Sequence, residues 1–100
     1  MEREERIDDV CAVVTNTRKM RAIVMERSGL PNSGIEEKSV DVAEVYFHDR
    51  STGVVGTVRV PLISGEDALR YVRRELRRYQ IPVDRIEKVA QVIYEIARRC

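Results

Sequence analysis

The sequence predicts an α+β domain in which a small antiparallel sheet is packed by two C-terminal α-helices. Residues 40–61 have the pattern of a β-hairpin, a valine-rich run near the N-terminus that of a further strand, and residues 64–99 carry two apolar stripes at helical spacing. The 100 residues suit one domain, and a hydrophobic content of 43% is enough for a core. We therefore expect a single domain over residues 1–100.

The N-terminal part of the chain is less regular. Residues 1–6 have no apolar anchor and are expected to fray. The run from Ile7 to Thr15 is rich in β-branched residues, which favours a buried strand over a helix. Residues 17–27 fit a helix or a strand, and the glycine and proline just beyond them favour the helix slightly. Residues 30–39 are rich in turn-forming residues and predict a flexible loop.

The hairpin at residues 40–61 has a predictable register. Apolar and polar residues alternate on both strands, so a slip by one residue would move Arg59 into the core. The favoured register pairs Glu44 with Arg59 and Tyr46 with Thr57, and it directs into the core Ala43, Val45, Phe47, Val58 and Val60. The polar connection at residues 49–53 is expected to be an exposed tip.

Two amphipathic helices are predicted after the hairpin. The first runs from Ser64, a good N-cap, to Tyr79. Its apolar side carries Ala68, Leu69, Val72, Leu76 and Tyr79, and its opposite side carries five arginines. Pro82 interrupts the helical pattern, and a second helix is expected from Asp84, as its cap, to Arg99.

The second helix is apolar around more of its circumference than one small sheet face requires. Such a helix either lies centrally in its domain or buries one side against a second copy. We expect the second arrangement, a homodimer whose candidate interface contains Val92, Tyr94 and Ile96. The central position is the alternative.

The composition indicates where the protein resides and what kind of organism it comes from. No run is long and apolar enough for a membrane span, and the N-terminus lacks the layout of a signal peptide, so a cytoplasmic location without membrane contact is expected. The 18 basic and 17 acidic side chains nearly cancel. Arginine outnumbers lysine and amides are scarce, which is typical of a heat-adapted protein, although a GC-rich genome would also favour arginine.

The residues that commonly carry catalysis form no recognisable constellation. His48 is the single histidine, and we interpret it as a solvated residue at a strand end. Cys11 and Cys100 have no metal-binding spacing, and the glycines do not form a phosphate-binding loop. We expect no enzymatic activity, no cofactor, no metal and no small-molecule substrate.

The leading functional prediction is a small intracellular binding or assembly module that acts through protein–protein contacts as a dimer. The alternative is nucleic-acid binding through the arginine side of the first helix, because guanidinium groups suit phosphates. The candidate contacts are Arg70, Arg73, Arg74, Arg77 and Arg78, with Arg59 and Arg50 as outlying residues. The competing interpretation is a solvated face that pairs with acids such as Glu75.

One stretch resembles a known family. GTVRVPL followed by two helices is similar to ribbon-helix-helix DNA-binding proteins, in which paired strands from two subunits enter the major groove. The resemblance implies that Thr57 and Arg59 would face bases. It covers under half of the chain, and a strand already paired in a hairpin is less free to pair across a dimer.

Overall fold

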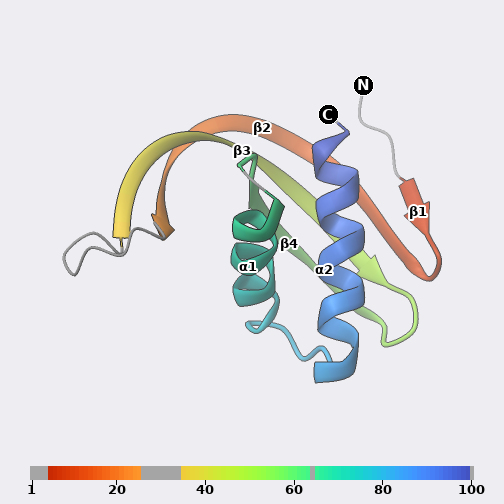
Figure 1. The fold of residues 1–100 in the computed structure, drawn as a ribbon. Helices are drawn as coiled ribbons and strands as arrows, with labels where there is room; N and C mark the ends of the chain where they lie inside the picture. The colour runs from red at the N-terminus through yellow and green to blue at the C-terminus, as the bar shows by residue number, and fades with distance from the viewer. Residues whose placement is uncertain (1–4, 26–34, 64, 100) are drawn as a thin grey trace.

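The computed structural model describes residues 5–25, 35–63 and 65–99. Four strands form one antiparallel sheet in the order β1-β2-β3-β4, and two helices follow them in the chain. The elements are β1 (Glu5–Ile7), β2 (Val10–Met25), β3 (Ile35–Asp49), β4 (Val54–Pro61), α1 (Gly65–Leu76) and α2 (Val83–Arg98). Both helices lie on the concave side of the curved sheet (Figure 1), so the predicted α+β fold is confirmed.

The register of the β3–β4 hairpin is also confirmed. Glu44 lies opposite Arg59, and Tyr46 lies opposite Thr57. All five side chains that were predicted to face the core are at most 1% exposed. Residues 50–53 form the exposed tip, where Gly53 adopts a positive φ of 79° that suits glycine. Asp49, expected to share this exposed tip, is instead buried.

The N-terminal strand differs from the prediction in where it begins. Residues expected to fray form β1, in which Glu5 pairs with Ala12. The predicted strand starting at Ile7 is divided by a turn, since Asp8 has a φ of 56° and the chain reverses there. Aspartate tolerates this left-handed conformation better than most residues do. Residues 1–4 lie outside the described part of the chain.

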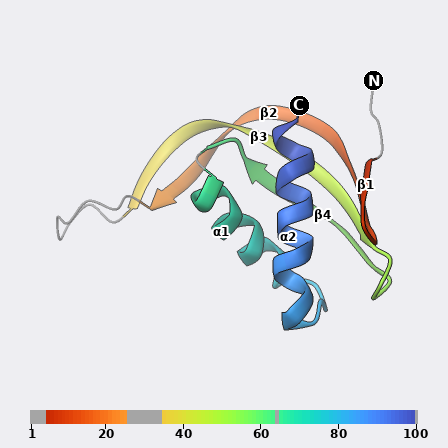
Figure 2. The ribbon, with the colours of Figure 1, turned by 45° about the vertical axis from the view of Figure 1, so that its right-hand side comes forward.

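The helix favoured for residues 17–27 is wrong, because β2 continues as a strand to Met25. The predicted loop at 30–39 is wrong in its second half, where β3 already begins at Ile35; residues 26–34 are outside the described residues. Glycine and proline can end a strand as well as a helix, so they did not distinguish the two. Residues 17–25 form a strand because they pair with β3 along this length. β4 pairs only with residues 42–49 of β3, so beyond them β2 and β3 continue as a two-stranded arm (Figures 1 and 2).

The first helix is shorter than predicted, because it ends at Leu76 and not at Tyr79. The Tyr79 ring packs edge-on against Phe47 with ring centroids 5.5 Å apart. Its hydroxyl accepts a hydrogen bond from the Thr57 N–H and donates one to the Thr57 carbonyl. A side chain at Gly56 would overlap the Tyr79 ring. The predicted cap at Ser64 lies outside the described residues.

The second helix lies centrally, in contact with α1, β2 and β3. It begins at Val83, after Pro82 as N-cap, so the predicted cap at Asp84 is wrong. Its buried residues are Val89, Ala90, Val92, Ile93, Ile96 and Ala97. Most of the wide apolar band is therefore covered within a single chain, and Ile86 and Tyr94 are partly buried. Neither described helix is long and apolar enough to cross a membrane.

Candidate functional site

Three arginines of α1 and the turn after it form a row on the helix surface opposite the core. Arg70, Arg74 and Arg77 are spaced by four and three residues, so they share one side of the helix over about 10 Å of its length. All three are exposed, and none has an ion-pair partner among the residues that the structure describes. We call these three residues the arginine row.

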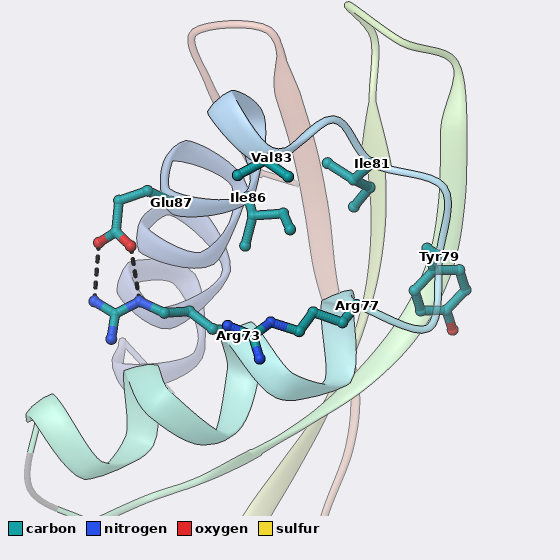
Figure 3. Close-up of a pocket in the computed structure, with 7 residues that line it drawn as sticks. All are labelled: Arg73, Arg77, Tyr79, Ile81, Val83, Ile86 and Glu87. Carbon is teal, nitrogen blue, oxygen red and sulfur yellow. Dashed lines mark hydrogen bonds and ion pairs between the residues drawn. The ribbon is translucent and has the colours of Figure 1, made fainter.

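Arg73 belongs to the predicted arginine face but not to this row, because it connects the two helices. Its guanidinium donates to both carboxylate oxygens of Glu87, at 2.7 and 3.0 Å, and to Glu66 at 3.2 Å. The bond to Glu87 raises the pKa of Arg73, and the same bond lowers the pKa of Glu87. Such a bidentate contact occupies the donor fork that a phosphate would use (Figure 3).

Arg78 and Arg59 share Glu75 as their partner. Arg59 donates to one oxygen of Glu75 at 3.3 Å and Arg78 to the other at 3.2 Å. The predicted pairing with acids thus holds for these two arginines and for Arg73. β4, which carries Thr57 and Arg59, is hydrogen-bonded to β3 of the same chain along its length, whereas the strand of the ribbon-helix-helix plan pairs with its counterpart in a second subunit. Arg50 is exposed at the hairpin tip, where its N–H donates to the Asp9 carbonyl.

A groove of about 470 Å³ lies between the end of α1 and the start of α2. Its lining combines apolar and aromatic side chains with charged ones: Arg73, Arg77, Tyr79, Ile81, Val83, Ile86 and Glu87. Val83 is 86% exposed, the most exposed of the large hydrophobic residues in the described chain. In Figure 3 the Arg77 side chain extends from the end of α1 into the space between the helices. The groove therefore combines an apolar surface with an unpaired cation.

Asp49 is a buried carboxylate that the sequence analysis did not identify. Its side chain is 0% exposed and binds Arg85 of α2 at 2.6 Å. Arg85 also reaches Asp9 at 2.9 Å, and this hydrogen bond lowers the pKa of Asp9. The cluster fixes the start of α2 to both hairpin turns. An arginine in the first turn of a helix opposes the helix dipole, and this was the available signal that it needed an acidic partner.

The sheet face away from the helices is not covered by any described element (Figures 1 and 2). It contains a hollow of about 170 Å³ lined by Cys11, Ala12, Tyr46 and His48. Tyr46 is 43% exposed, whereas His48, expected to be solvated, is half-buried. The alternation of residues along β3 predicted that Tyr46 and His48 face outward. The hollow also needs Cys11 and Ala12 of β2, and the sequence analysis predicted no register between β2 and β3.

The candidate protein interface is placed differently from the arginine row. Val92 and Ile96 lie in the core, and Tyr94 is partly buried beneath Arg98, whose guanidinium carbon lies 5.5 Å from the ring centre. Within residues 5–25, 35–63 and 65–99, no three or more His, Cys, Asp or Glu residues are grouped to hold a metal ion.

Comparisons with protein-family models, with curated proteins and with solved structures find no match to this chain.

Proposed function

We propose that this chain is a non-enzymatic binding module that binds nucleic acid through the arginine row. One observation carries the proposal: Arg70, Arg74 and Arg77 are exposed and lack a carboxylate partner within the described chain. Ion pairs hold the remaining two arginines of this segment, Arg73 and Arg78. The row therefore leaves three positive charges open to an external anion.

The length of the row suits a phosphate backbone. It extends for about 10 Å along α1, and a strand of a duplex presents about three phosphates over that distance. A guanidinium binds a phosphate through two parallel N–H donors, so each arginine of the row has the capacity for one such contact. The row thus supplies positioning contacts to the backbone rather than recognition of particular bases.

The structure offers less support for self-association than for an external partner. The homodimer was expected because α2 has a wide apolar band. Val92 and Ile96 of that band, however, are already buried in the core of a single chain. A dimer therefore remains a prediction that light scattering can check. Nucleic-acid binding does not depend on that outcome.

The test is fluorescence anisotropy with duplex and single-stranded DNA and RNA in about 50 and 200 mM salt. Three phosphate contacts predict an affinity for duplex that falls about 40-fold between these concentrations. Arg74→Glu is expected to weaken binding strongly, whereas Arg98→Glu, an exposed arginine of α2, serves as the matched control. Absence of binding at the lower salt concentration, or equal losses in both variants, would contradict the proposal.

The groove between the helices favours a second candidate function, the binding of a protein segment. Val83 leaves an apolar side chain exposed beside Ile86, and Arg77 adds an unpaired cation. This combination complements a helical segment that carries leucine-like side chains beside carboxylates. It preserves the predicted protein–protein function at a different surface from the one expected.

A defined peptide tests this candidate. An amphipathic helical peptide with leucine on one face and glutamate at its margin is titrated into the labelled protein, and amide shifts are followed by NMR. Shifts at Val83 and Ile86 that Val83→Ser removes are expected. Val55→Ser, at another exposed valine, is the matched control. Shifts that survive Val83→Ser would exclude the groove as the binding site.

A further inference from the structure

We propose that the uncovered face of the sheet is a second site, which binds a base of a single-stranded nucleic acid by stacking. Its centre is the hollow between Tyr46 and His48. The choice of ligand rests on the proposed function, but the residues are different from those of the arginine row. The two sites also lie on opposite layers. The row is on α1, which covers one face of the sheet (Figure 1), whereas Tyr46 and His48 alternate along β3 with the buried Val45 and Phe47 and so project from the other face.

The register places two rings and an apolar floor together. Tyr46 and His48 are two residues apart on β3, so both project from the same face, about 7 Å apart along the strand. His48 lies opposite Cys11 on β2, and Tyr46 lies opposite Val13. On the other side, His48 lies opposite Val55 of β4, which is 48% exposed. Apart from Thr57, which lies opposite Tyr46 on β4, the cross-strand neighbours of the two rings are apolar.

The size and lining of the hollow indicate a flat ligand. Its volume of about 170 Å³ is below that of pockets for drug-sized molecules, which begin near ~300 Å³. Rings interact best through their faces and edges with other planar groups. Every nucleobase offers such a face, and stacking on exposed aromatic side chains is how sheet surfaces commonly hold single strands.

A free cation lies beside the hollow. Arg6 of β1 pairs with Cys11 in the sheet, so its side chain projects from the same uncovered face. It is exposed and donates to the Asp8 carbonyl, and no carboxylate within the described residues binds it. Arg18, farther along the face, is already neutralised by Glu44 at 2.6 Å. Arg6 is therefore positioned for the phosphate that flanks a stacked base.

The exposed Tyr46 ring distinguishes single strands from duplexes. Bases in a duplex are stacked on each other and their faces are not available, whereas unstacked bases of a single strand can lie on a protein ring. The hollow should thus add affinity for single strands only. The arginine row, which contacts the backbone, should serve both forms.

The first test uses adenosine, which has a base but no phosphate and therefore bypasses the arginine row. Titration into the labelled protein is expected to shift the amide signals of Cys11, Tyr46 and His48. Tyr46→Phe should retain the shifts because it keeps a ring, and Tyr46→Ala should lose them. Absence of shifts in the wild-type protein, or their survival in Tyr46→Ala, would overturn the proposal.

The second test compares a single strand of about 16 nucleotides with a duplex of the same sequence, by anisotropy. Tyr46→Ala is expected to weaken single-strand binding about tenfold or more and duplex binding less than twofold. An unchanged single-strand affinity would overturn the stacking site and leave the arginine row standing. If the wild-type protein bound neither form, the proposed function would fail, and the adenosine titration would still decide about the hollow.

Discussion

Two groups of arginines in this chain differ in whether they form an ion pair with a carboxylate. Arg73 and Arg85 connect elements: the first ties α1 to Glu87 of α2, and the second ties α2 to Asp49 at the hairpin tip. The arginine row has the same residue type on the same helix as Arg73 and no such partner within the described chain. On an arginine-rich helix, the positions of nearby carboxylates therefore decide the role of each arginine. Those that reach a carboxylate hold the structure together, and the others can bind an external partner.

Removal of a structural arginine should have the largest effect on stability. Arg85→Ala leaves Asp49 as a buried carboxylate whose other hydrogen-bond partners among the described residues are Ser51 and Thr52. We expect a loss of about 3 kcal/mol in the free energy of unfolding, measured in urea. Arg70→Ala, from the row, should change it by less than about 0.5 kcal/mol. Equal losses in the two variants would remove the distinction between the groups.

Reversal of charge in the row should have the opposite profile. The variant Arg70→Glu/Arg74→Glu/Arg77→Glu is expected to bind duplex DNA about a hundredfold more weakly, which corresponds to roughly 2.7 kcal/mol. Its free energy of unfolding should change by no more than about 1 kcal/mol, because the three side chains are exposed and make no ion pairs in the described chain. A variant that unfolds before it loses affinity would assign the row a structural role.

A third change tests how the turn after α1 is held. Gly56→Ala should cost about 2 kcal/mol of stability, because its methyl group would overlap the Tyr79 ring. In a Tyr79→Ala background the same substitution should be nearly neutral, as the ring is gone. A thermal or urea unfolding cycle of the four proteins measures this coupling. Additive losses would show that the overlap is not the cause.

The smallest effect is expected for the ion pair between the helices. The bond from Arg73 holds the pKa of Glu87 below its ordinary value of 4.5, so the pair contributes stability above that pH and loses it as the pH falls through the lowered pKa. Glu87→Gln should cost about 0.5 kcal/mol at neutral pH, and the difference from wild type should disappear once the pH falls below the lowered pKa of Glu87. Glu95→Gln, whose contact with Arg98 is longer at 3.8 Å, should show less. A pH-independent difference would contradict the assignment.

Much of the fold was predictable because its signals are local. Alternation fixed the register of β3 with β4, and helical periodicity placed the apolar sides of both helices correctly. Residues 17–27 were not predictable from local signals, since punctuation by glycine and proline suits either structure. Residues 17–25 form a strand because β2 pairs with residues 35–49, and part of that partner strand was expected to be a loop.

The site was predictable in part for the same reason. Periodicity placed five arginines opposite the core, but which of them remain unpaired depends on the acids that they reach: Glu66 and Glu75 on α1 itself and Glu87 on α2. The cluster of Asp49 with Arg85 joins residues far apart in sequence and escapes any pattern of spacing. The sequence did not indicate how much of the apolar surface of α2 is covered by α1 and the sheet, which bury Val92 and Ile96 of the candidate interface within one chain.

The most direct test of the arginine row is the salt dependence of duplex binding. Each phosphate contact that is removed lowers the slope of log affinity against log salt concentration by about 0.9. The variant Arg70→Ala/Arg74→Ala/Arg77→Ala is therefore predicted to bind with a slope shallower by roughly 2.7 than that of the wild-type protein, and Arg98→Ala with an unchanged slope. The same slope in all three proteins would contradict the claim that the row binds phosphates.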